Sequence, residues 1–181
     1  MLLRLNYNSM ITVCSTKINT LTQENYINFI NSIIFDTIPC SCGHSGCLKK
    51  HGYYDRFVKD KDISKIKLAI LRVKCNVCNK THAVIPSNII PYSSITASDT
   101  LDIINAYENN TSFEPIMSDN FTIDESNISY VISNYIKYWK ERLISESISL
   151  SEPLVNIISK CFNYFARTFM QNKCVTNILV S

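Results

Sequence analysis

The sequence PCSCGHSGC spans residues 39–47, and the sequence CNVC follows at residues 75–78. Structural zinc sites take four thiolate or imidazole ligands in a tetrahedron. Two cysteines on a tight turn, with two residues between them, supply two of these four ligands. Cys75 and Cys78 have this spacing. Because the earlier cluster can supply the other half, the two segments together predict a zinc ribbon.

The first cluster leaves its ligand pair open, because it holds three cysteines and two histidines lie in or just after it. The alternatives are Cys40 with Cys42 or Cys42 with Cys47, with His44 or His51 in place of one thiolate. Gly43 suits a turn directly after Cys42, since glycine adopts backbone conformations that other residues disfavour. The predicted metal ligands are Cys40, Cys42, Cys75 and Cys78, with Cys47 as the alternative ligand from the first cluster.

The apolar patterning of the chain predicts its cellular compartment, and the number of metal ligands predicts what the metal does. The chain turns polar soon after Met1, and no later stretch stays apolar for long enough to cross a bilayer. We therefore expect a cytoplasmic protein whose cysteines are thiols, metal ligands or redox groups. A redox pair would need only Cys75 and Cys78 and would leave residues 39–47 unexplained. A closed four-ligand site has no place for water, so its zinc should support folding and not catalysis.

Strand and helix patterns surround the two clusters. Residues 48–59 and 66–74 are rich in β-branched and aromatic residues and predict a hairpin, with a third strand at 81–85. Upstream, residues 9–14 read as a strand, and Thr22 begins a helix. Downstream, helical periodicity predicts helices at 100–109, with Ser98 or Thr100 as its cap, then at 112–118, 124–145 and 153–171.

These patterns define an α+β fold class: a small antiparallel zinc ribbon flanked by an N-terminal helix and a C-terminal helical region. The predicted segments are 1–38, with a strand and helix; 39–91, the ribbon; 96–147, a region like a helix-turn-helix; and 153–181, a helix and tail.

Charge is spread unevenly along the chain. The whole chain has a net charge of +3, but residues 40–82 carry ten lysines or arginines against three aspartates. Four thiolates around Zn²⁺ would subtract two charges, so the ribbon stays basic. A basic patch interleaved with aromatic rings is typical of a surface that contacts nucleic acid. The predicted contacts are Lys49, Lys50, Arg56, Lys67, Arg72 and Lys74 in the hairpin, and Asn127, Tyr130, Asn134 and Lys137 in the helix at 124–145.

Several stretches resemble a known family. They are PCSCGHSGCLKKHGYYDR (39–56), ILRVKC (70–75), THAVIPS (81–87) and PYS (91–93), followed by IDESNISYVISNYIKYWKERL (123–143) and FMQNKCVTNIL (169–179). They resemble an uncharacterised bacterial family of zinc-ribbon proteins, which is similar to the N-terminal zinc-ribbon and helix-turn-helix part of insertion-sequence transposases. Many relatives have two residues between the first two cysteines, whereas Pro39 stands here at the earlier position. The resemblance implies a ribbon, a helix-turn-helix-like unit and DNA binding.

The sequence predicts no enzyme. Its carboxylates are scattered, and it has no phosphate-cradling glycine loop and no nucleophile arrangement. We expect a non-catalytic, zinc-dependent DNA-binding protein, related to transposases or accessory to a mobile element, with no membrane and no small-molecule substrate as partners. The alternative is a zinc-stabilised protein-interaction module that docks through Trp139 or through the face from Phe162 to Phe169.

Overall fold

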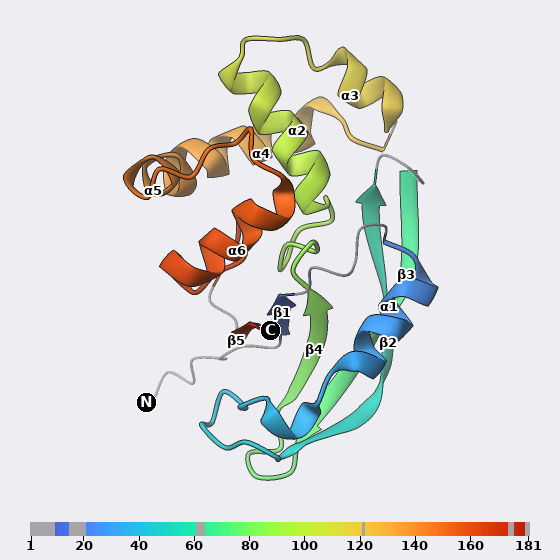
Figure 1. Ribbon diagram of the computed structural model, residues 1–181. Helices are drawn as coiled ribbons and strands as arrows, with labels where there is room; N and C mark the ends of the chain where they lie inside the picture. Colours follow the sequence, from blue (N-terminus) through green and yellow to red (C-terminus); the bar gives the residue numbers. More distant parts are fainter. Residues whose placement is uncertain (1–9, 15–20, 61–63, 121, 174–175, 180–181) are drawn as a thin grey trace, which may run out of the picture.

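A computed structural model of the chain describes residues 10–14, 21–60, 64–120, 122–173 and 176–179. Residue 9 of the first predicted strand lies outside these ranges. So do Lys61 and Asp62, which entered the charge count. Figure 1 shows one sheet with a single helix beside its long hairpin and a group of helices beyond one end.

The sheet has five strands in the order β2-β3-β4-β1-β5. Their bounds are β1 Met10–Cys14, β2 Leu48–Asp60, β3 Ser64–Cys75, β4 Thr81–Pro86 and β5 Thr176–Leu179. β3 pairs antiparallel with β2 and β4, whereas β1 pairs parallel with β4 and β5. The predicted α+β class is confirmed. The sheet is mixed and not purely antiparallel, because β1 adds in parallel beside β4, and β5 adds in parallel beside β1.

The helical elements fall into one helix before the hairpin and a group after β4. Their bounds are α1 Gln23–Ser32, the 3₁₀ turn η1 Phe35–Thr37, α2 Ala97–Glu108, α3 Glu114–Asp119, α4 Glu125–Asn134, the π turn η2 Tyr135–Trp139, α5 Lys140–Ser145 and α6 Leu154–Phe165. The predicted helix at 124–145 is thus one continuous helical run with a π turn in the middle. The predicted helix from residue 153 is shorter than expected, because Ala166 takes a left-handed conformation (φ 50°) and ends α6.

Helix α1 begins and packs as its sequence indicates. The Thr22 hydroxyl accepts a hydrogen bond from Asn25 N at 3.1 Å, so Thr22 caps the helix. The buried face presents Tyr26 to the sheet. Its hydroxyl accepts a hydrogen bond from Leu71 N and donates one to Val84 O, both at 2.8 Å. Tyr26 therefore joins β3 and β4 beyond their three paired positions, which end at Arg72 and Ala83.

The helices after β4 enclose an apolar core of their own, separate from the core between the sheet and α1. Trp139 is fully buried, and its ring meets those of Phe165 and Phe169 edge-on at centroid distances of 5.9 and 6.0 Å. Phe162 is 5% exposed. The face that the interaction-module alternative would use is therefore part of the core. The predicted cap of α2 was also wrong, since Thr96 and not Ser98 or Thr100 accepts the hydrogen bond from Asp99 N.

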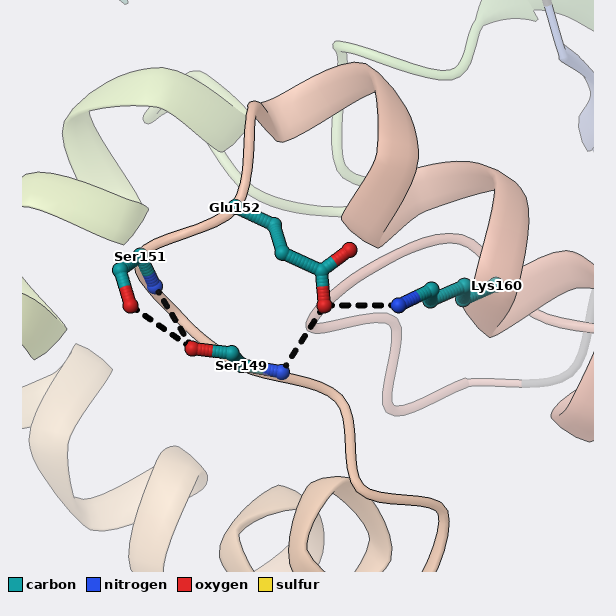
Figure 2. A network of polar contacts seen from close by, with 4 residues as sticks. All are labelled: Ser149, Ser151, Glu152 and Lys160. Atoms are coloured by element: carbon teal, nitrogen blue, oxygen red, sulfur yellow. Dashed lines mark hydrogen bonds and ion pairs between the residues drawn. The ribbon is translucent and has the colours of Figure 1, made fainter.

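The turn between α5 and α6 is tied by polar contacts (Figure 2). The Glu152 carboxylate accepts hydrogen bonds from Ser149 N at 3.2 Å and from Lys160 Nζ at 2.7 Å. The Ser149 and Ser151 hydroxyls lie 2.7 Å apart. These contacts fix the direction in which α6 returns toward the sheet.

Among the residues that the structure describes, no helix combines the length and the apolar character needed to span a membrane.

Candidate metal centre

Four cysteine sulfurs converge at the end of the sheet away from the helical group. They belong to Cys40, Cys42, Cys75 and Cys78, and all four Sγ atoms lie within 4.8 Å of one another. Two of the separations are 3.6 Å, between Cys40 and Cys78, and 3.8 Å, between Cys42 and Cys75. A tetrahedron with a metal–sulfur distance of about 2.3 Å has edges of about 3.8 Å. The thiols are free and their sulfurs are spaced to hold one metal ion.

The first cysteine loop, residues 39–47, closes on itself. Gly43 N donates to Cys40 O, and Cys40 N donates to His44 O, both at 2.8 Å. Gly43 has a φ of 88°, a conformation that a side chain would strain. This turn brings Cys40 and Cys42 to the same side although only one residue separates them.

The second cysteine loop, residues 75–80, follows directly from β3. Val77 N and Cys78 N both point at Cys75 Sγ, at 3.4 Å. Cys75 N donates to Lys80 O at 2.9 Å, and Asn79 takes a left-handed conformation that turns the chain toward β4. Backbone N–H groups aimed at sulfur stabilise a thiolate, which is the form that binds metal.

The electrostatics of the four thiols differ. Burial acts to raise the pKa of Cys75, but the N–H groups of Cys78 and Val77 together with neighbouring thiols outweigh it and lower this pKa to about 6. The backbone N–H and the ring of His44 lower the pKa of Cys42. Burial raises the pKa of Cys40 to about 12. The pKa values of Cys75 and Cys42 are thus shifted toward the thiolate form, and a bound cation would favour deprotonation of all four thiols.

Three further side chains lie against the four sulfurs. His82 is fully buried, and its Nε2 lies 3.4 Å from Cys40 Sγ. His44 Nδ1 lies 3.5 Å from Cys42 Sγ. The Cys47 thiol donates to His44 O at 3.1 Å and stays outside the group of four. Side chains that contact metal ligands orient them and tune the site.

Sequence reasoning missed His82. It lies in THAVIP, which reads as an ordinary strand, and nothing local marks a histidine that reaches a cysteine 42 positions earlier. His51, considered as a ligand, lies in β2 and is exposed.

Several predicted nucleic-acid contacts cluster beside the metal centre. Lys49 in β2 lies directly opposite Lys74 in β3, and Arg72 projects from β3 two positions away from Lys74. Lys49, Lys50 and Arg72 are exposed. Neither residues 39–54 nor residues 66–86 contain an aspartate or glutamate. The cysteine-loop end of the hairpin therefore carries only positive formal charge in these segments.

Two other predicted hairpin contacts serve different purposes. The Arg56 guanidinium donates to Ile90 O at 3.0 Å and to Ser93 O at 2.7 Å, so it fastens the segment after β4 to the hairpin. Lys67 forms an exposed ion pair with Asp55 at 2.8 Å. Arg56 is committed to the fold, whereas Lys67 stays accessible.

The four predicted contacts of the long helix lie in the helical group, at the other end of the sheet from the cysteine loops (Figure 1). Asn127 Oδ1 accepts from Lys59 Nζ at 2.6 Å, and Asn134 Oδ1 accepts from Asn172 Nδ2 at 2.8 Å. Tyr130 is 58% exposed. Lys137 is exposed and lies over the ring of Tyr138. The structure thus does not bring the helix contacts together with Lys49, Lys50, Arg72 and Lys74 at the cysteine-loop end.

Comparison with known proteins finds a family match but no match to a curated protein or a solved structure. Residues 39–125 match a family described as a domain of unknown function (DUF6431). The matched range contains both cysteine loops, all four converging cysteines and the whole hairpin, and it continues through α2 and α3.

Proposed function

We propose that the chain is a zinc-dependent DNA-binding protein in which the metal builds the binding surface and takes no part in catalysis. Zn²⁺ held by Cys40, Cys42, Cys75 and Cys78 closes the two cysteine loops into a zinc ribbon. Soft thiolate ligands in a tetrahedron favour zinc among the common cellular divalent ions. Sulfur separations of 3.6 and 3.8 Å support this assignment.

The observation that carries the DNA-binding proposal is the pairing of Lys49 with Lys74. Like charges directly opposite each other destabilise a pair of strands, and no acidic residue belongs to the adjoining segments. Phosphates bound to the two ammonium groups, one to each, would offset this repulsion. With Lys50, Arg72 and Lys80 nearby in the chain, the surface keeps an excess of positive charge beside a zinc centre of net charge −2.

The proposal narrows the predicted contacts. Arg56, Asn127 and Asn134 are held by partly buried hydrogen bonds, whereas the hydrogen bond from Arg72 to the Thr81 hydroxyl is exposed. The first contacts are therefore assigned to Lys49, Lys50, Arg72 and Lys74. The helical group then supports the hairpin and need not enter a DNA groove. The resemblance to the N-terminal parts of transposases adds the further proposal that the protein is related or accessory to a mobile element.

The test is fluorescence anisotropy of a labelled DNA duplex with the zinc-loaded protein at a series of salt concentrations. Lys49→Ala with Lys74→Ala should weaken binding and reduce the slope of log affinity against log salt by about two, since each phosphate contact contributes roughly 0.9. The control, Lys160→Ala, also removes a lysine charge, but from α6. Absence of binding even at low salt would overturn the proposal, as would an equal effect of the Lys160 variant.

A metal assay tests the first half of the proposal separately. Native mass spectrometry of the purified protein should find one zinc ion per chain. A protein that carries no metal, and gains none when zinc is added, would contradict the ribbon.

A further inference from the structure

The hairpin carries a second exposed surface besides its basic end. Tyr53 and Phe57 lie in β2 with exposures of 60% and 50%. Such exposure is unusual in this sheet, where the large apolar side chains of β3 from Ile66 to Val73 are buried. Aromatic rings exposed on a basic strand are groups on which nucleic-acid bases can stack.

The strand register places these rings on one face. Tyr53 pairs with Leu71, Asp55 with Ala69 and Phe57 with Lys67, and residues at alternate positions of a strand project to the same side. The bulge between Lys50 and Gly52 brings Lys50, opposite Val73, to this same side. We call this surface the outer face of β2; it comprises Lys50, Tyr53, Asp55, Phe57 and Lys67.

Helix α1 explains why only part of this face is open. It packs against β3 and β4, where Leu71 and Val73 on the same face are fully buried. β2 is the edge strand of the sheet, and although the 3₁₀ turn η1 after the helix contacts it, Tyr53 and Phe57 stay exposed. The two rings therefore stand along an open strip beside the helix.

The charged side chains along the strip indicate what kind of ligand it would bind. Lys50 lies at the cysteine-loop end of the strip and next to Lys49 in the chain, whereas Lys49 and its partner Lys74 project to the other face of the hairpin. Lys67 lies opposite Phe57, and its partner Asp55 is 56% exposed at the side chain. An exposed ion pair of this kind contributes little to stability, so a phosphate can recruit the Lys67 ammonium. The strip thus carries two cations and two aromatic rings, the kinds of side chain that bind single strands, with Asp55 between the rings as the partner of Lys67.

The spacing of the rings favours a single strand over a duplex. Four residues of a β-strand place the Cα atoms of Tyr53 and Phe57 about 14 Å apart. In a duplex the base faces are stacked against one another, and only base edges are open in the grooves. Unpaired bases can separate and stack on protein rings. Small Ala69, opposite Asp55, leaves room between the two rings.

We propose that the outer face of β2 is a stacking platform for single-stranded nucleic acid. This rests on the proposed function and names its substrate: an unpaired strand whose phosphates meet the cysteine-loop end and whose bases stack on Tyr53 and Phe57. The duplex is bound through the basic end alone and more weakly.

The test compares one labelled oligonucleotide as a single strand and annealed to its complement, with zinc-loaded protein. Tyr53→Leu and Phe57→Leu keep an apolar side chain but remove the ring. Each should lower single-strand affinity by about tenfold while leaving duplex affinity almost unchanged. Tyr53→Phe should retain wild-type binding, since the ring is kept. Circular dichroism and zinc content of each variant should match wild type, because both positions are exposed.

The outcomes separate this inference from the proposed function. If neither the single strand nor the duplex binds, both are overturned. If both bind and the leucine variants bind as wild type does, the platform is overturned and the basic surface stands. If the leucine variants lose single-strand and duplex affinity equally, stacking on unpaired bases is again overturned.

Discussion

The two ends of this molecule are held together in different ways. At the helical end, Trp139, Phe165 and Phe169 pack ring against ring, and the fold there rests on buried apolar surface. At the cysteine-loop end, residues 43–46 are all exposed, and the buried groups that meet across the two loops include Cys40 and Cys75. Apolar packing needs no bound ion, whereas a thiolate cluster that holds a metal depends on that metal. The same chain should therefore respond differently at its two ends.

The largest expected effect is at the cysteine-loop end. Cys75→Ser should reduce the zinc content from one ion to none, and the loops should become sensitive to protease, because structural zinc sites contribute folding free energy outright. Native mass spectrometry and limited proteolysis measure both effects. Cys47→Ser is the matched control and should keep the metal, since this thiol donates to His44 O outside the group of four. A Cys75→Ser protein that retains zinc would show that Cys75 is not required to hold the metal at the cysteine-loop end.

At the helical end the largest effect should come from packing. Trp139→Ala should lower the free energy of unfolding by about 3 to 5 kcal/mol, because it leaves a cavity in the core and removes the donor to Asn172. Denaturant titration followed by circular dichroism measures this. Tyr164→Ala, at a ring that is 57% exposed, should cost less than about 0.5 kcal/mol. Zinc content should stay at wild-type level, and its loss would show that the two ends are not independent.

A smaller effect is expected between the two ends, where the Tyr26 hydroxyl joins β3 to β4. Tyr26→Phe removes the hydroxyl that bridges β3 and β4 and leaves Leu71 N without its acceptor and Val84 O without its donor. The expected cost is about 1 to 3 kcal/mol. Hydrogen exchange of the Leu71 amide should quicken. Tyr53→Phe, which loses an exposed hydroxyl, is the control for stability, and an equal loss there would contradict the bridging role.

The smallest effect concerns the turn in Figure 2. The hydrogen bond from Lys160 lowers the pKa of Glu152 below its ordinary value. A carboxyl with a depressed folded-state pKa contributes stability above its unfolded pKa, and this contribution is lost as pH falls through the folded pKa. Glu152→Gln should therefore be less stable than wild type at neutral pH, and the difference should shrink as pH falls below the ordinary carboxyl pKa and through the lowered pKa of Glu152. Unfolding titrations at several pH values measure it; a constant difference would show that the charge is unimportant.

The two ends also differed in how far the sequence could predict them. Helix periods and the cap at Thr22 are local signals, and the structure has helices near each predicted range. The spacing of Cys75 and Cys78 is local too, and the structure places their sulfurs beside those of Cys40 and Cys42. The proposed boundaries of the four segments stay predictions, although strands from three of them share one sheet.

The features that could not be predicted from the sequence depend on contacts between residues that are far apart in the chain. The roles of Arg56 as a fastener and of His82 as a neighbour of Cys40 require strands to be assembled first. Ile136 has the right period for the buried face of its helix, yet it is 48% exposed where the π turn shifts the register. A pattern based on a regular helix cannot show such a shift.

The parallel pairing of β1 with β5 has a consequence for how the chain folds. Ile11 pairs with Thr176, so two strands from opposite ends of the described chain must meet before the sheet is complete. Contacts between residues this far apart form slowly because the intervening chain must first be ordered. We expect the hairpin of β2 and β3 to form early and the β1–β5 pair late. Until then β1 offers an unpaired edge, so a newly made chain has an interval in which that edge is open to aggregation.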